Sequence, residues 1–371
     1  MHIGFITADL SHTHGWAHYS LAMTEAVRAQ GVEVTVVAAS NSPTDYDFPL
    51  YPILPTVKPA ERNQLRKLIG VASQARAALA NCDLIHCTTE PYAPLAAWVA
   101  GPRPYLQTGH GTYARAGWNR HPLVRRLHQR AFRMADLVVC DSHYTERVAR
   151  EYTPGITSTT VTLAIDPSRF TDLPPLPEPV TRPTILTAGG VKKRKGTPQL
   201  VEAVAAVRQQ LPNVQCIVIG STDQEPETVA RVRTLIDTHE LHDHVQLLGF
   251  VDEPTLRGWY GAADVFALPS INDGYKFEGF GLVHLEASAA GLPVVGADNC
   301  GAEDAVVHNE TGLLVSQANL TEELPGALLT LLTDPALRRR MGEAGRAHAR
   351  RQTWDAKAAE MIALYEVALS P

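Results

Sequence analysis

The sequence has little of what marks secreted, membrane-spanning or nucleic-acid-binding proteins. Its five cysteines are odd in number and scattered, which excludes a disulfide framework and a zinc-binding spacing. No apolar run reaches the ~18 residues of a membrane-spanning helix, and no charged-then-apolar leader precedes the first strand. A net charge of -6 argues against a general nucleic-acid binder. We therefore expect a cytoplasmic protein.

The 371 residues contain enough apolar side chains for two cores. They are 45% apolar and 19% charged, which excludes a disordered chain, and domains average roughly 150 residues. Short β-branched runs alternate with helical stretches in both halves, a rhythm typical of parallel sheets covered by helices. This pattern predicts an α/β protein with two Rossmann-like domains. No GxGxxG turn follows the first strand, which disfavours a hydride-transferring dehydrogenase.

Prolines mark the expected joint between the two halves. Six of them lie between Asp166 and Pro183, where they block both helices and strand pairing. We place an N-terminal domain at 1–170, a linker at 171–183 and a C-terminal domain at 184–352. The alanine-rich segment 353–371 reads as a final amphipathic helix.

The segment EGFGLVHLEASAAGLPV at 278–294 carries the clearest chemistry. Gly279 and Gly281 flank Phe280 where a helix should begin, so backbone N–H groups can approach an anion there. Glu278 precedes that helix and Glu286 follows about 12 Å further along it, whereas paired glycosidase carboxylates are ~5 to 9.5 Å apart. The two glutamates therefore suit two ends of one elongated ligand. The alternative is a glycine-rich loop with one capping and one exposed glutamate.

The whole string closely resembles the signature of retaining family 4 glycosyltransferases, whose GT-B fold has two Rossmann-like domains facing across a cleft. In that family the last helix packs back on the N-terminal domain, which bears the acceptor side. Five further segments are similar to the family: GGVKKRKGTPQLVEAV (189–204), ADVFALPS (263–270), GAEDAVVHNETGLLV (301–315), QTGHGTYAR (107–115) and ADLVVCDSHYTERV (135–148).

The resemblance implies transfer of a hexosyl unit from a UDP- or GDP-sugar to a hydroxyl acceptor, with retention of configuration and no required metal or other cofactor. The acceptor class stays open among small molecules, glycans and lipid-linked molecules. A nucleotide-sugar epimerase of the same fold and a non-catalytic nucleotide-sugar-binding protein are the alternatives.

The resemblance also assigns donor-binding roles to the second domain. Glu278 would contact the sugar hydroxyls, Glu286 the ribose hydroxyls and Lys195 the diphosphate. Cations preorganised on a leaving group stabilise the transition state more than the ground state, so Lys195 is also a predicted catalytic residue. The resemblance adds Glu278 to the predicted catalytic residues. The residues expected to offer backbone N–H groups to the donor are Gly279, Phe280, Gly281 and Leu282.

One position departs from the family pattern. Many members carry an arginine where this chain has Gly190, a predicted donor-binding position. The missing charge is expected from Lys192, Lys193 or Arg194 in the same loop. The insertion INDGYKF at 271–277 follows in the donor loop, and we interpret it as an exposed excursion, with Asp273 or Lys276 as the residues able to reach a substrate.

The acceptor side is expected around two segments of the first domain. His110 follows a strand at the carboxyl edge of the sheet, where ligands bind in open α/β folds, and the resemblance makes it catalytic. A histidine that caps a turn is the alternative. Gly15, Trp16 and His14 lie after the first strand and are predicted to bind the acceptor. A metal at His12, His14 and His18 and plain loop structure are the alternatives.

Charge is unevenly distributed along the chain. Residues 1–175 carry +2 and the remainder -8, and the stretch 91–135 has seven arginines and no carboxylate. Within 115–134, a helix starting at Pro122 would carry arginines on one side and Leu123, Leu127, Ala131 and Met134 on another. Such a helix either lies on an anionic membrane or receives a phosphorylated acceptor, and in the first case the protein would lie at the inner face of the membrane. The third alternative is a solvated helix whose apolar side covers the core. The oligomeric state is left open.

Overall fold

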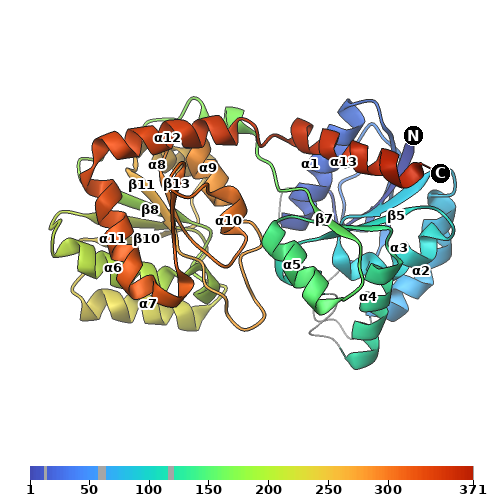
Figure 1. The fold of residues 1–371 in the computed structure, drawn as a ribbon, viewed down its shortest axis with the longest axis horizontal. Coiled ribbons are helices and arrows are strands. Elements are labelled where there is room, and N and C mark those ends of the chain that lie inside the picture. Colours follow the sequence, from blue (N-terminus) through green and yellow to red (C-terminus); the bar gives the residue numbers. More distant parts are fainter. Residues whose placement is uncertain (12–14, 57–63, 116–120, 371) are drawn as a thin grey trace. The chain divides into compact units, whose positions relative to one another are not determined.

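The computed structural model describes residues 1–11, 15–56, 64–115 and 121–370 (Figure 1). The chain divides into two compact units, Met1–Leu163 with Trp354–Pro371, and Ala164–Thr353. Each unit is built on one parallel sheet with helices on both faces. The predicted α/β class with two Rossmann-like domains is confirmed.

The sheet of the first unit has the strand order β3-β2-β1-β4-β5-β6-β7. Its central strands are apolar runs buried on both faces, as expected where helices cover a parallel sheet. Ile3 of β1 aligns with Val34 on one side and Leu84 on the other. The strands are β1 (His2–Ile6), β2 (Glu33–Ala39), β3 (Leu50–Leu54), β4 (Leu84–Cys87), β5 (Tyr105–Gly109), β6 (Leu137–Cys140) and β7 (Ser158–Thr160).

Two hydrophobic cores cover the two faces of this sheet. On one face, α1 (Gly15–Ala29) packs beside α13 (Trp354–Leu369), and Met361 and Tyr365 of α13 are fully buried (Figure 1). The C-terminal helix therefore lies in the same unit as the N-terminal strand. On the other face lie α2 (Gln64–Ala78), α3 (Ala93–Ala100), α4 (Pro122–Met134) and α5 (His143–Tyr152), preceded by the short turns η1 (Glu90–Tyr92) and η2 (Gly111–Ala114).

The sheet of the second unit has the strand order β10-β9-β8-β11-β12-β13. Its strands are β8 (Thr184–Ala188), β9 (Gln215–Ile219), β10 (Val245–Gly249), β11 (Val265–Leu268), β12 (Val294–Ala297) and β13 (Gly312–Val315). Its helices are α6 (Thr197–Arg208), α7 (Pro226–Thr238), α8 (Glu253–Ala262), α9 (Leu282–Ala290), α10 (Ala302–Ala305), α11 (Leu320–Thr333) and α12 (Pro335–Ala349), with short turns η3 (Pro167–Phe170), η4 (Lys193–Lys195) and η5 (Gln317–Asn319).

The division between the units falls after Leu163, earlier than the predicted boundary at 170. The ring of Phe170 packs edge-on against Tyr260 of α8, with the centroids 5.6 Å apart. Leu176 and Leu173 lie so close to Gly258 and Gly261 that added Cβ atoms there would contact them at 2.8 and 3.1 Å. The proline-rich segment therefore packs on the second unit, and the 171–183 linker belongs to it.

Local differences from the expected elements have simple causes. Strand β3 contains Pro52, which an edge strand tolerates because its outer N–H groups need no partner, and the sequence pattern does not reveal it. Helix α9 begins at Leu282, two residues later than Phe280, because Gly281 takes a left-handed conformation with φ +80°. Within the described part of the chain, no helix combines the length and apolar character that crossing a membrane requires.

Candidate functional site

The predicted donor residues of the second unit follow β8 and β11, two neighbouring strands of its sheet. Lys195 lies in η4 after β8, and Glu278 lies in the loop between β11 and α9. Carboxyl ends of parallel strands meet at one edge, so these loops are adjacent. The amide of Ile271 donates to the carbonyl of Arg194 at 2.8 Å, which ties the inserted segment 271–277 to the η4 turn.

Glu278 is the centre of a buried ionic cluster. Its Oε2 lies 2.6 Å from Lys195 Nζ and 2.9 Å from Arg194 Nη1, and it accepts a hydrogen bond from Ser270 Oγ at 3.2 Å. Burial alone would raise the pKa of Glu278, but the two cations lower it to about 2. Burial lowers the pKa of Lys195, and Glu278 opposes that shift. Two cations on one carboxylate leave a net positive site.

Glycines allow the loops around Glu278 to approach closely. Gly196 has φ +70°, and a Cβ there would fall 1.9 Å from the carbonyl oxygen of Pro269. A Cβ on Gly301 would fall 1.7 Å from the carbonyl oxygen of Gly279. Only glycine permits both contacts, and the second one lies at Gly279 in the loop that leads into α9.

The loop after β8 shows where the expected substitutes for an arginine lie. Gly190 has φ +79°, and a Cβ there would meet the carbonyl oxygen of Ser221 at 3.2 Å. Lys193 pairs outward with Asp273 at 2.6 Å, and Arg194 pairs inward with Glu278. Lys192 is half-buried, and burial together with Arg194 and Lys195 lowers its pKa. The inserted loop thus draws Lys193 away and leaves Lys192 and Arg194 nearer the site.

Glu286 lies on α9 and is held by a tyrosine that the sequence did not indicate. Tyr260 of α8 is buried and donates its hydroxyl to Glu286 Oε2 at 2.9 Å. Burial raises the pKa of Glu286, whereas the Tyr260 hydrogen bond and Arg169 oppose that rise. Tyr260 therefore holds one carboxylate oxygen of Glu286 in place.

His110 of the first unit follows β5 and lies between two carboxyl groups. Asp141, after β6, places Oδ2 3.7 Å from His110 Nδ1, and Glu90, after β4, accepts the His110 backbone N–H. His110 Nε2 lies 3.0 Å from the carbonyl oxygen of Thr88. Burial lowers the pKa of His110, but the two carboxylates outweigh it and raise the pKa overall. The imidazole is thus oriented on both sides by protein groups.

Tyr19 packs against His110, and a second aromatic pair lies in the same unit. The Tyr19 ring meets His110 edge-on with the centroids 4.6 Å apart, and Trp16 lies 4.5 Å from Tyr113. Gly15 is exposed at the start of α1. His14 and His12 lie outside the described residues. No group of three or more potential ligands for a metal occurs among the residues that are described.

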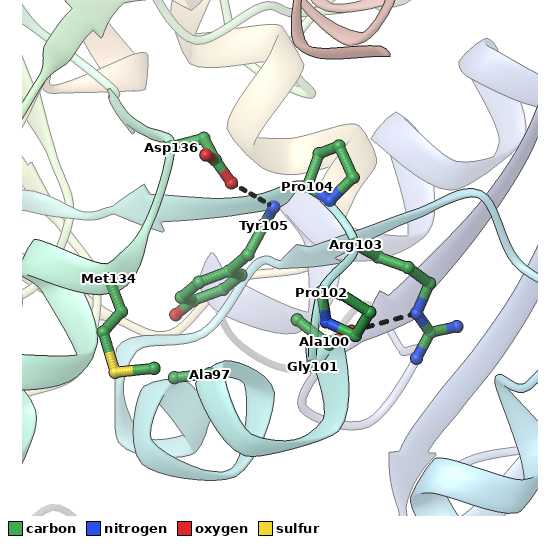
Figure 2. Close-up of a pocket in the computed structure, with 9 residues that line it drawn as sticks. All are labelled: Ala97, Ala100, Gly101, Pro102, Arg103, Pro104, Tyr105, Met134 and Asp136. Atoms are coloured by element: carbon green, nitrogen blue, oxygen red, sulfur yellow. Dashed lines mark hydrogen bonds between the residues drawn. The ribbon is translucent and has the colours of Figure 1, made fainter.

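A separate hollow of about 230 Å³ lies at the opposite edge of the first sheet (Figure 2). Its wall includes Met134, Arg103 and Asp136. Asp136 accepts the backbone N–H of Tyr105 at 2.8 Å, and Arg103 donates to four backbone carbonyls, two at the end of α3 and two in the turn after α2. Because these polar groups are already satisfied, the hollow offers little to a charged nucleotide.

The sequence alone missed several residues of these clusters. Asp141 and Glu90 are polar residues directly after strands, and the strand order β4-β5-β6 is what brings them to His110. Ser270 is the last residue of ADVFALPS (263–270), a segment that the sequence did identify, but no role was predicted for Ser270 itself. Tyr260 has no local signal beyond its place in an amphipathic helix. The roles of the predicted site residues stay predictions.

Sequence comparisons match most of the chain to known families. The family described as "Glycosyltransferase Family 4" matches residues 13–169, and that described as "Glycosyl transferases group 1" matches residues 168–348. A GDP-mannose-dependent alpha-(1-6)-phosphatidylinositol monomannoside mannosyltransferase of Mycobacterium tuberculosis is 31% identical over 72% of both chains. A D-inositol 3-phosphate glycosyltransferase of Jonesia denitrificans is 36% identical over 49% of this chain, which spans only 42% of that relative.

Solved structures share the architecture. A sucrose-phosphate synthase from Thermosynechococcus elongatus has a TM-score of 0.78 and 24% identity, with 98% of each chain covered. Anabaena HepE in complex with UDP and glucose has a TM-score of 0.76 and 19% identity, with 99% of this chain and all of that one covered. At these identities the likeness establishes the fold.

Proposed function

This chain belongs to the family 4 glycosyltransferases and has their GT-B fold, and from that premise we propose a retaining hexosyl transfer. The donor is a nucleotide sugar and the acceptor a hydroxyl group. The relative with 72% coverage is named as GDP-mannose-dependent, which favours GDP-mannose as the first donor to test, with UDP-sugars next. Relatives named for inositol-containing acceptors favour an inositol phosphate or phosphatidylinositol acceptor.

The observation that carries this proposal is the pair of cations on one buried carboxylate. Arg194 and Lys195 both contact Glu278 at an edge of the sheet where anions bind in open α/β folds. Cleavage of the sugar–oxygen bond places a growing negative charge on the nucleoside diphosphate. Lys195 and Arg194 stabilise that charge without reorganising, which lowers the barrier more than it strengthens substrate binding.

Glu278 suits orientation of the sugar and not attack on it. With two cations beside it and a pKa of about 2, it is a weak nucleophile that accepts hydrogen bonds from sugar hydroxyls. We propose that the acceptor hydroxyl attacks from the leaving-group face and passes its proton to a diphosphate oxygen as the sugar–oxygen bond breaks. Atoms and charge balance without a covalent enzyme intermediate or a metal.

The rest of the donor rests on α9 and its N-terminal loop. The N–H groups of Gly279, Phe280, Gly281 and Leu282 are proposed to face the sugar and phosphates, and Gly190 lets the nucleotide approach the backbone closely. Glu286 accepts the ribose hydroxyls. On the first unit, His110 with its neighbouring carboxyl groups is proposed to stabilise positive charge on the sugar ring, with Trp16, Gly15 and His14 on the acceptor side.

The proposal is tested by incubating the protein with a panel of GDP- and UDP-sugars, with and without inositol phosphate acceptors. Acceptor-dependent release of nucleoside diphosphate, with an α-linked product from an α-linked donor, is the expected result. Conversion of the donor sugar to its epimer in the absence of an acceptor would establish an epimerase instead. Binding without any turnover across the panel would favour a non-catalytic protein.

A further inference from the structure

Three neighbouring helices of the first unit, α2, α3 and α4, expose apolar side chains that ordinary helices would bury. Leu123 of α4 is 62% exposed and Ile69 of α2 is 70% exposed. Trp98 on α3 and Leu127 and Met134 on α4 are also exposed. Helix α3 packs against both α2 and α4, so the three helices lie side by side on one face of the sheet (Figure 1).

Helix α4 differs from the expected solvated helix over a core stripe. The predicted apolar stripe was Leu123, Leu127, Ala131 and Met134, yet only Ala131 of these is buried. The core is contacted instead by His128, Ala131 and Phe132. The apolar stripe therefore faces outward, interleaved with arginines.

The same three helices contain no aspartate or glutamate at all. Their basic residues are Arg66, Lys67, Arg76, Arg125, Arg126, Arg130 and Arg133. By contrast, α1 and α13 on the opposite face of the sheet carry Glu25, Asp355, Glu360 and Glu366 among their few charges. Helix α5 on the same face of the sheet carries Glu146 and Glu151, so the stretch without carboxylates is confined to α2, α3 and α4.

We propose that the exposed face of α2, α3 and α4, the α2–α4 face, docks on an anionic lipid bilayer. A cationic helix face with interspersed Leu, Ile and Met is the composition that lies in a membrane interface, and Trp is enriched at that depth. Charge complementarity selects the occupant, since seven basic residues without a carboxylate attract anionic headgroups. Arg76 lies 5.3 Å over the Trp98 ring, which keeps that charge beside the exposed indole.

If the protein docks through this face, the carboxyl edge of the sheet, which bears His110, stays accessible to an acceptor. His110 lies at the carboxyl ends of the strands, whereas α2, α3 and α4 cover one face of the sheet. A face parallel to the bilayer therefore places the acceptor edge at the membrane surface without burying it. This geometry suits an acceptor whose hydroxyl sits in the headgroup layer.

Vesicle flotation of the full chain tests the proposal, and it does not depend on enzymatic activity. Wild type should float with phosphatidylcholine vesicles that contain phosphatidylglycerol and not with pure phosphatidylcholine. Arg126→Gln/Arg130→Gln should weaken partitioning about 30-fold, because each basic residue near an anionic surface contributes a factor of about five. Arg339→Gln/Arg340→Gln on α12 changes the net charge equally and should float like wild type.

A second variant separates membrane docking from simple charge attraction. Leu123→Ser/Leu127→Ser keeps every arginine, replaces exposed side chains and should reduce vesicle binding about tenfold while leaving retention on a soluble polyanion unchanged. Failure of wild type to float at low salt would overturn the proposal. Equal losses in the α12 control, or no loss in the leucine variant, would also overturn it.

Discussion

The two units offer opposite charge arrangements at their carboxyl edges. In the second unit, Arg194 and Lys195 share one carboxylate, Glu278, so the cluster carries net positive charge. In the first unit, His110 meets Asp141 through its ring and Glu90 through its backbone N–H, so one histidine lies beside two carboxyl groups. The first arrangement suits a diphosphate, and the second suits hydroxyls and a sugar ring that gains positive charge. In the proposed function, this difference in charge balance assigns the diphosphate to the second unit and the sugar ring to the first.

Replacing Lys195 by alanine should reduce the transfer activity more than any other substitution in the two clusters. The substitution removes one of the two cations on Glu278, and we expect kcat to fall about 10²- to 10³-fold, the range seen when one preorganised charge donor is lost. Steady-state transfer assays measure it. Lys193→Ala, which removes an outward-facing cation of the same loop, should retain most activity. Wild-type rates in Lys195→Ala would refute the diphosphate assignment.

His110→Ala should separate turnover from donor binding. Because His110 belongs to the first unit, its loss should reduce kcat about 10- to 10²-fold while the donor dissociation constant changes little. Isothermal titration with the donor gives the second value. His143→Ala, an exposed histidine of α5, serves as the matched control. An unchanged kcat would remove His110 from the mechanism.

Much of the second-unit cluster could be named from the sequence because its parts lie in contiguous strings. Lys195 and Glu278 each occur in such a string, but their contact depends on the close approach of Gly196 to Pro269, which only the fold reveals. In the first unit, His110 and Asp141 each stood in such a string, but no role was predicted for Asp141. Glu90 and Asp141 become neighbours of His110 through strand order, and no local pattern encodes strand order.

The exposed leucines of α4 show a second reason for incomplete prediction. Periodicity identifies an apolar stripe, and burial is the usual assumption for it. Helix α4 contacts the core through Phe132 and His128, so its apparent core stripe points away from the sheet. When a helix has apolar residues on two sides, tertiary packing decides which side is buried.

Tyr260→Phe should give an intermediate and selective effect. The substitution removes the hydroxyl that holds Glu286 Oε2, so we expect the donor KM to rise about five- to tenfold with little change in kcat. Preference for GDP over 2′-deoxy-GDP should fall, and the effect should vanish in a Glu286→Gln background. Unchanged discrimination in Tyr260→Phe together with a loss in Glu286→Gln would show that Glu286 needs no positioning partner.

Substitution of Glu90 should produce the smallest effect, a change in the pH dependence of stability and not in the reaction rate. Burial raises the pKa of Glu90 to about 7, well above that of an unfolded glutamate, while His110 opposes the rise. The folded state therefore binds the proton more tightly, and its stability is greatest below the unfolded pKa and declines as pH rises through about 7. The raised pKa of His110 gives a decline in the same direction above its own unfolded value.

Glu90→Gln removes one of these titrations and keeps an oxygen for the His110 N–H. Wild type should lose about 2 kcal/mol between pH 5 and pH 8 that the variant does not lose, a difference of roughly 4 to 8 °C in Tm. Thermal denaturation at both pH values measures it, with the exposed Glu151→Gln as control. If Glu90→Gln keeps the wild-type pH dependence, then Glu90 is ionised in the folded protein across that range, and the two-carboxylate environment of His110 is fully charged.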